Sequence, residues 1–424
     1  MEYTDWIKPR PFQDDPGFIG KVFAAQNRES GLEEVICHLA TETWINQQMQ
    51  LGHQLDRSQE AVLDTDELCF GKRKVLYRLR MPDNSLWVAR LHNTLYNKTA
   101  VTDHTTRIKN QMLLFESEVA TMQFVKENTQ IPVPKVYGYD LTYANVLGTP
   151  YIFMEYIAGK PYPFPFSGQR PIKDDDLVKI HTQLTNFAWQ LSKQPFDKIG
   201  QLRFATGEER SVAIGPIIDR KERLYGPFTS SRTFYKERAK TVYEFETRRH
   251  SLGEDSDVED SLESAALHVL AAEHAGKECF DSGPFILQHA DMHWQNLLFD
   301  EQCTILGVID WEWTQTVPVD SFNLLPWNFA SKMLPYRAEN AARHEQNSLQ
   351  QFRALSDMGS TTIERHILEA MISFQGSLPQ YIARYMEEYN WPEVRRKHFN
   401  HLKELISLII GKGVSCQYLT TLTT

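Results

Sequence analysis

Apolar residues recur along the chain with two different periods, and these periods predict where helices and strands lie. Between 105 and 127 they recur every three or four residues, which predicts an amphipathic helix, and 177–191 shows the same spacing. Apolar and polar residues alternate over 68–91, which predicts a β-hairpin with its turn at 81–85. A continuous apolar run at 150–157 predicts a buried strand.

A second group of short apolar runs surrounds a polar loop. The run 285–287 predicts a buried strand that leads into this loop. The runs 297–299 and 305–309 predict two strands, which the polar turn 300–304 joins as a hairpin. In the folded hairpin, residue 310, which follows the second strand, lies next to residue 296, which precedes the first strand.

The two ends of the chain show looser helical patterns. A helix is predicted at 32–51, within a leader of residues 1–50. Three further helices are predicted at about 336–357, 361–388 and 392–412.

Length and composition restrict the class of protein. At 424 residues the chain favours two lobes over one small core. The net charge of −10 argues against nonspecific nucleic-acid binding, which depends on basic surface. The five cysteines are scattered and odd in number, as for free thiols in a reducing compartment. No secretory signal and no apolar stretch of roughly 20 residues is visible, so we expect a cytoplasmic protein without a membrane span.

The polar loop and the hairpin carry the groups that phosphoryl transfer requires. In that reaction one carboxylate orients the attacking hydroxyl and accepts its proton, while an amide oxygen and a second carboxylate hold Mg²⁺. We therefore expect Asp291 to be the base, with Asn296 and Asp310 as the metal ligands. Glu312 is placed to reach a second Mg²⁺.

A different chemistry is also open for this loop. His289, Asp291 and His293 alternate, so in an extended segment they point the same way and form a zinc site of a metal-dependent hydrolase. Asn296 and Asp310 downstream fit phosphoryl transfer better than this alternative.

These motifs resemble a known family. The segments HADMHWQN at 289–296 and IDWE at 309–312 resemble the aminoglycoside phosphotransferase and choline kinase superfamily, although Ala290 stands where that superfamily usually has glycine. The segments WVAR at 87–90 and FMEYIAG at 153–159 are similar to its fungal branch.

The resemblance implies an α+β, protein-kinase-like fold with two lobes. The small N-lobe holds an antiparallel sheet, and the C-lobe is mainly helical. We expect an N-terminal helical extension at 1–50, the N-lobe at 51–157, and the C-lobe with the catalytic loop and the substrate-pocket helices at 158–424.

The resemblance also implies the residues of a nucleotide site. Arg90 stands at the position of the kinase lysine that contacts the phosphates, and Glu118 of the 105–127 helix is its expected partner. The strand at 150–157 is the expected hinge, where backbone groups near Glu155 and Ile157 pair with the adenine edge.

The function implied is an ATP- and Mg²⁺-dependent transfer of the γ-phosphoryl group to a hydroxyl of a small molecule. The alternative is a nucleotide-binding pseudokinase or binding module of the same fold. Gly71 as the single glycine of the phosphate loop, Arg90 in place of lysine, and Ala290 favour that alternative. Choline, an amino alcohol, a sugar and a secondary metabolite all fit as acceptors, and the oligomeric state is not specified.

Overall fold

The structure is a computed structural model, and it divides into two compact units. It describes residues 29–53, 59–70, 73–93, 104–161, 174–205, 211–219, 222–251, 258–275, 280–292, 294–322, 350 and 353–354. By contact clustering, unit 1 comprises Met1–Lys126 and Val133–Ala158, and unit 2 comprises Glu127–Pro132 and Gly159–Thr424. Each unit is described separately below.

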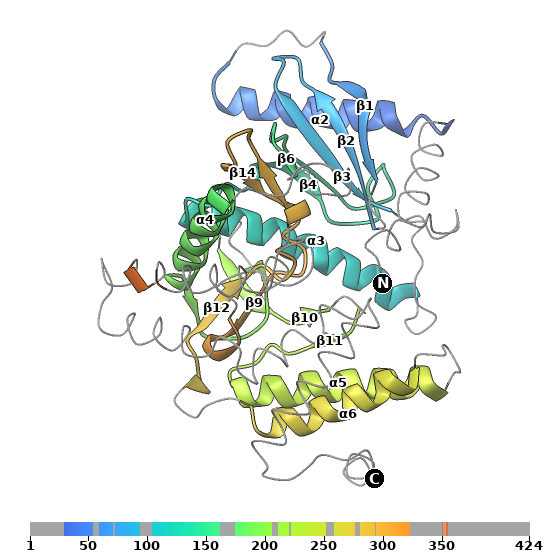
Figure 1. Ribbon diagram of the computed structural model, residues 1–424. Coiled ribbons are helices and arrows are strands. Elements are labelled where there is room, and N and C mark those ends of the chain that lie inside the picture. The colour runs from blue at the N-terminus through green and yellow to red at the C-terminus, as the bar shows by residue number, and fades with distance from the viewer. Residues whose placement is uncertain are drawn as a thin grey trace, which may run out of the picture. The chain divides into compact units, whose positions relative to one another are not determined.

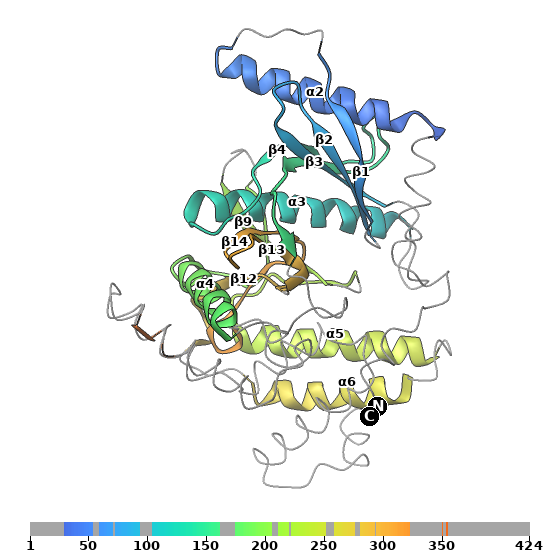
Figure 2. The same ribbon diagram turned by 45° about the horizontal axis from the view of Figure 1, so that its top comes forward.

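Unit 1 is built on a five-stranded antiparallel sheet in the order β1-β2-β3-β5-β4. Its elements are α2 (Leu32–Gln50), β1 (Val62–Phe70), β2 (Lys74–Arg80), β3 (Leu86–His92), α3 (His104–Asn128), β4 (Val136–Asp140) and β5 (Tyr151–Glu155). The sheet lies between α2 and α3 (Figures 1 and 2). Its two faces therefore have different surroundings.

The face of the sheet toward α2 is apolar. Because side chains alternate along a strand, the odd-numbered residues of β2 share this face. Val75, Tyr77 and Leu79 are completely buried there, in one core with Ile36 and Trp44 of α2. The predicted alternation in this hairpin is confirmed, and α2 contributes to the core of unit 1.

The opposite face of the sheet carries charged residues. Lys74 pairs with His92 across β2 and β3, and Leu76 pairs with Arg90, so all four side chains point away from α2. Helix α3 covers this side, and its Phe115, Val119 and Val125 are completely buried, as the helical periodicity predicts.

In its described residues, unit 2 combines three α-helices with small antiparallel sheets, in the orders β15-β12-β7, β14-β13-β6, β8-β9 and β10-β11. Its helices are α4 (Asp174–Ser192), α5 (Ser231–Ser251) and α6 (Val258–Glu273). Its strands are β6 (Lys160–Pro161), β7 (Pro195–Phe196), β8 (Gln201–Phe204), β9 (Val212–Gly215), β10 (Ile217–Ile218), β11 (Leu224–Tyr225), β12 (Phe285–Gln288), β13 (Leu297–Phe299), β14 (Ile305–Val308) and β15 (Gln315–Pro318), with 3₁₀ turns at Trp294–Asn296 and Val319–Ser321. Helices α5 and α6 lie side by side (Figures 1 and 2).

Most of the predicted elements are present, and several strands were not predicted. Helices at 105–127 and 177–191, the strand at 285–287 and the 297–309 hairpin are confirmed by α3, α4, β12 and β13–β14. Strands β1 and β15, β4 (Val136–Asp140) and the short strands β6 to β11 were not predicted from the sequence. The helices predicted over 336–412 lie outside the described residues, apart from 350 and 353–354.

Candidate functional site

The loop after β12 is held by His289, which bonds to the backbone on both sides of its ring. The His289 Nε2 donates to the carbonyl of Ile309 at 3.2 Å, and its Nδ1 accepts from the N–H of Asp291 at 3.2 Å. These two bonds define a neutral ring that carries its proton on Nε2. The ring packs edge-on against Trp311, with centroids 4.8 Å apart. His289 thus fixes the loop, and both of its nitrogens are occupied in doing so.

Asn296 is oriented by the same loop. Its side-chain Nδ2 donates to the backbone carbonyl of Asp291 at 2.9 Å, which leaves the amide oxygen directed away from that bond. Across the β13–β14 hairpin, the N–H of Ile309 donates to the carbonyl of Asn296 at 2.9 Å. The hairpin therefore brings Asn296 next to the residue that precedes Asp310, as its pattern predicts.

The residues after Asp310 form a tight buried turn, in which the Thr314 N–H donates to the Trp311 carbonyl at 3.3 Å. Asp310 has a φ of 62° and Trp313 a φ of 71°, both in the left-handed region that non-glycine residues rarely adopt. Such conformations cost on the order of 1–3 kcal/mol each and cluster at functional sites. Trp311 is completely buried and donates from Nε1 to the carbonyl of Val308 at 2.8 Å, which anchors the turn. Both tryptophans pack in the core.

The donor set of this loop fits Mg²⁺. Asp291, Asn296, Asp310 and Glu312 offer carboxylate and amide oxygens, which are the ligands that this hard cation prefers. Among the described residues, no group of three or more His, Cys, Asp and Glu side chains is arranged to hold a metal ion. These two observations agree, because Mg²⁺ is usually bound through one or two carboxylates together with waters and substrate phosphates.

Unit 1 carries a buried cluster of charge on the face toward α3. The Arg90 Nη2 lies 3.2 Å from the Glu118 Oε1, so the predicted ion pair is present. The Lys74 Nζ lies 3.8 Å from the other carboxylate oxygen and 3.4 Å from the centroid of the Phe115 ring. All three charged side chains are at least nine-tenths buried. One carboxylate thus faces two cations.

Lys74 is not among the site residues predicted from the sequence, although its strand position carries a signal. The register of the hairpin closed by the 81–85 turn pairs Leu76 of β2 with Arg90 of β3. Lys74 lies two residues before Leu76 on β2, so it is on the same face of the sheet as Arg90. What the local pattern cannot show is that α3 covers this face and buries the ammonium group.

His92 lies beside this cluster and is neutral. Burial, together with the positive charges of Lys74, Arg73 and Arg107, lowers the pKa of its ring from 6.5 to about 3. The ring contacts Phe115 edge-on, with centroids 6.2 Å apart. The buried ring of His92 is therefore uncharged at neutral pH.

The strand predicted as the hinge is β5. Backbone groups at its C-terminal end form hydrogen bonds within unit 1. The Glu155 N–H donates to the Lys135 carbonyl at 2.8 Å, and its carboxylate accepts from the Lys135 N–H at 3.0 Å. The N–H of Tyr156 donates to the Leu86 carbonyl at 3.1 Å. Glu155 is thus held in the sheet by its own N–H and its side chain. Ile157 comes one residue after Tyr156, which makes the last of the bonds described above.

The segment with these loops matches a known family. Residues 101–316, just over half of the chain, match the Phosphotransferase enzyme family. The chain therefore belongs to this family. Both the resemblance recognised in the sequence and the α+β, kinase-like class of the fold are confirmed.

Individual relatives match over shorter stretches. The Altered inheritance of mitochondria protein 9, mitochondrial, of Zygosaccharomyces rouxii is 30% identical over 145 residues, which cover 33% of this chain and 22% of the relative. A subtelomeric hrmA-associated cluster protein of Aspergillus fumigatus is 30% identical over 30% of this chain and 23% of its own length. These matches thus span less than a quarter of either relative.

A solved structure is also similar. An aminoglycoside phosphotransferase from Alicyclobacillus acidocaldarius has 12% identity and a TM-score of 0.35, covering 84% of this chain and 91% of its own.

The names of the relatives contradict the expected cytoplasmic location. Those from Zygosaccharomyces rouxii, Clavispora lusitaniae and Yarrowia lipolytica are named as mitochondrial proteins. The expectation rested on the lack of a secretory signal, which has an apolar core. Mitochondrial transit peptides are amphipathic instead, so that observation did not bear on mitochondrial import. Across the described residues, no helix is long and apolar enough to span a membrane.

Proposed function

We propose that the chain transfers the γ-phosphoryl group of ATP to a hydroxyl of a small molecule, with Mg²⁺. The observation that carries this proposal is the bond from Asn296 Nδ2 to the Asp291 backbone. It orients an amide oxygen beside the hairpin that leads to Asp310, so the loop and the hairpin together carry the Asp291 carboxylate and two side chains suited to binding Mg²⁺. Family membership supports phosphotransferase chemistry in general.

Each residue of the loop has a distinct role in the proposed reaction. Asp291 orients the acceptor hydroxyl and accepts its proton, while Asn296 and Asp310 hold Mg²⁺. When bound, Mg-ATP supplies the phosphoryl group and a cation that neutralises its charge. His289 takes no part in the chemistry, because both ring nitrogens bind backbone groups.

The residues of unit 1 serve the nucleotide in this proposal. Arg90, held by Glu118, binds phosphate oxygens. The carbonyl of Glu155 and the backbone of Ile157 pair with the adenine edge, since the Glu155 N–H is already bonded within the sheet.

Thermal unfolding with and without Mg-ATP tests the nucleotide site. A ligand that binds only the native state raises its stability, by about 2.7 kcal/mol at a hundredfold excess over Kd. We expect a Mg²⁺-dependent rise in the melting temperature of the wild type and its loss in Asp310→Ala. Glu301→Ala is the matched control, because Glu301 is an exposed carboxylate in the turn of the same hairpin. No rise with any nucleotide in the wild type would contradict the proposal.

A second measurement separates an active enzyme from a pseudokinase. ATP consumption is followed with a panel of hydroxyl acceptors that includes amino alcohols and sugars. We expect acceptor-dependent turnover that Asp291→Asn abolishes while it keeps the Mg-ATP-induced thermal shift. Nucleotide binding by the wild type without turnover on any acceptor would favour the pseudokinase instead.

For its location, we propose that the protein is mitochondrial. The names of several relatives support this. Fractionation of yeast cells that express the tagged chain tests it, and recovery of the protein only in the soluble fraction outside the organelles would contradict it.

A further inference from the structure

Tyr156, the first residue after β5, is held by a side chain of β2. The Arg78 Nη1 donates to the Tyr156 Oη at 3.2 Å, and the guanidinium carbon lies 5.2 Å from the centroid of the Tyr156 ring. The arginine therefore contacts both the hydroxyl group and the ring. Together these contacts fix the ring, because the cation attracts its π face and the hydrogen bond sets its direction.

Arg78 is itself oriented by a carboxylate of β1. Its Nη2 donates to the Asp64 Oδ2 at 2.7 Å, and the two side chains are 15% and 18% exposed. Ordering a long arginine side chain costs conformational entropy, which several contacts offset better than one. Because Asp64 binds one nitrogen of the planar guanidinium and Tyr156 binds another, the group is held in one orientation. The three residues form a contact chain, the Asp64–Arg78–Tyr156 chain, that joins β1, β2 and the end of β5.

This chain lies on the same face of the sheet as Arg90. Residues that pair directly across antiparallel strands share a face. Asp64 pairs with Arg78, Arg78 with Val88, and Val88 with Met154. Arg90 lies two residues beyond Val88 on β3, so its side chain points the same way. The proposed phosphate-binding arginine and the chain thus serve one face.

The backbone of Tyr156 joins the two residues whose backbone groups are proposed to bind adenine. Glu155 precedes it and Ile157 follows it. The Tyr156 N–H donates to the Leu86 carbonyl of β3 at 3.1 Å, while its side chain is bonded to β2. The direction of the next peptide depends on the two backbone dihedrals of Tyr156. Attachment of both its backbone and its side chain therefore restricts the orientation of the Ile157 backbone.

We infer, on the basis of the proposed phosphotransferase function, that Arg78, oriented by Asp64, is a positioning residue for the base of the nucleotide. It acts through Tyr156 on the backbone that binds adenine, and it does not contact the phosphates. The two arginines of this face then serve different parts of the nucleotide: Arg90 binds the phosphates, and Arg78 orders the segment that recognises the base.

The test measures the affinities of Tyr156→Phe and Arg78→Met for ADP, adenosine and Mg²⁺-tripolyphosphate. The first variant keeps the ring and removes the hydroxyl, and the second keeps an aliphatic side chain and removes the guanidinium. We expect both to bind ADP and adenosine more weakly by the same factor, roughly threefold to tenfold, as for the loss of one hydrogen bond. Tripolyphosphate has no base, so its affinity is expected to match that of the wild type.

Arg80→Met is the matched control, because Arg80 is a cation on the same strand that lies 3.5 Å from the same Asp64 oxygen, with its side chain 48% exposed. We expect this variant to bind all three ligands like the wild type. The double variant at 78 and 156 is expected to lose no more affinity than Arg78→Met alone, because both changes break the same bond. If Arg78→Met does not fold, Tyr156→Phe decides the matter.

Wild-type affinity for adenosine in folded Tyr156→Phe, or an equal loss for tripolyphosphate, would overturn the inference alone. A loss for ADP without a loss for adenosine would also overturn it, because Arg78 would then serve the phosphates. Failure of the wild type to bind ADP or Mg-ATP would overturn the proposed function as well.

Discussion

Among single residues, Glu118 has the largest expected effect on stability. Its carboxylate is 1% exposed and faces both Arg90 and Lys74. Removing one partner of a buried ion pair costs roughly 3–5 kcal/mol, because the remaining charge stays buried. We predict that Glu118→Gln lowers the free energy of unfolding in urea by this amount. Glu127→Gln, at the exposed end of the same helix, is the control and is expected to change it little.

His92 makes stability depend on pH. Its pKa falls from 6.5 in the unfolded chain to about 3 in the folded protein, so the unfolded state binds the proton more readily. The stabilisation by the neutral ring is therefore complete above pH 6.5 and is lost progressively as the pH falls toward 3. At about pH 5 the loss is ~2 kcal/mol, since each pH unit is worth about 1.4 kcal/mol.

We predict that, between pH 7 and about pH 5, the wild type loses ~2 kcal/mol more of its unfolding free energy than His92→Gln does. The comparison removes the contribution of carboxylates, which both proteins share. Equal losses in the two proteins, measured by urea unfolding at each pH, would show that His92 is not held neutral.

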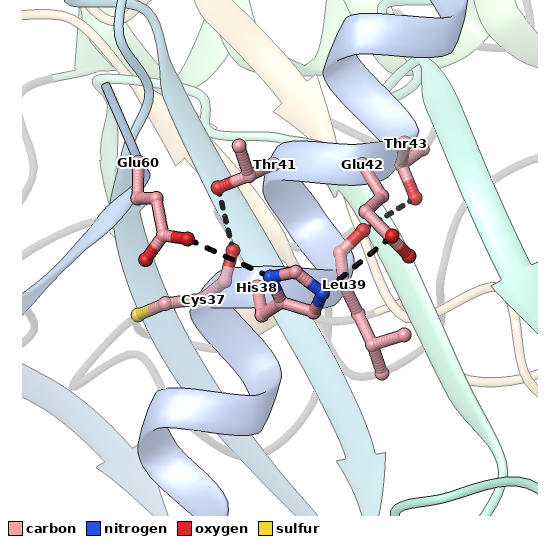
Figure 3. Close-up of polar contacts among 7 residues, drawn as sticks. All are labelled: Cys37, His38, Leu39, Thr41, Glu42, Thr43 and Glu60. Carbon is pink, nitrogen blue, oxygen red and sulfur yellow. Dashed lines mark hydrogen bonds and ion pairs between the residues drawn. The ribbon is translucent and has the colours of Figure 1, made fainter. Parts of the chain in front are cut away.

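At the scale of elements, the approach of α2 to β4 depends on a glycine. A Cβ at Gly138 of β4 would lie 2.7 Å from the Cγ2 of Thr43, which is closer than such atoms come. Thr43 cannot easily turn away, because its Oγ1 donates to the Leu39 carbonyl at 2.8 Å (Figure 3). We predict that Gly138→Ala lowers the free energy of unfolding by about 1–3 kcal/mol through overpacking.

The Thr43→Ala change removes the methyl group that an alanine at 138 would meet. In a double-mutant cycle, we therefore expect Gly138→Ala to cost less in the Thr43→Ala background than in the wild type. An equal cost in both backgrounds would mean that the destabilisation comes from the backbone of β4 and not from contact with α2.

The elements that the sequence predicts are those with a strong local period. Helix α3 and the β2–β3 hairpin have such patterns. Strand β1 does not: its sequence VLDTDELCF carries three acidic residues, and its pairing with β2 shifts register between Asp64 and Cys69. Strand β15 is buried along its whole length and ends in a proline, so its short sequence resembles a turn.

The candidate site is predictable to different degrees in the two units. Asp291, Asn296 and Asp310 lie within one loop and hairpin, so their spacing is visible in the sequence. The Arg90–Glu118 pair was expected only by resemblance to kinases. Lys74 could not be assigned from the sequence, because its burial depends on how α3 packs against the sheet, which the local pattern of β2 does not contain.

At the scale of the whole molecule, the family match covers only one of the three residues of the charge cluster. Residues 101–316 include Glu118 and the loop with Asp291, Asn296 and Asp310, whereas Lys74 and Arg90 precede the match. The two cations therefore belong to a part of the chain that the family assignment does not describe.

The response of the whole protein to metal ions distinguishes phosphoryl transfer from the hydrolase alternative. A zinc hydrolase would need a histidine ligand from this loop, and His293 lies outside the described residues. His289 has no lone pair to offer, since its Nδ1 accepts the Asp291 N–H and its Nε2 carries the proton. We predict that EDTA leaves the melting temperature of the nucleotide-free protein unchanged.

The same protein should respond to Mg²⁺ only when nucleotide is present, because an oxygen site with few protein ligands depends on phosphate oxygens to complete it. The measurement is a set of thermal scans with EDTA, Zn²⁺ or Mg²⁺, each with and without ADP. A fall in melting temperature with EDTA alone, reversed by Zn²⁺, would mean that a resident metal stabilises the fold. His289 would then have to give up at least one of its two backbone bonds, and the loop geometry that supports phosphoryl transfer would no longer hold.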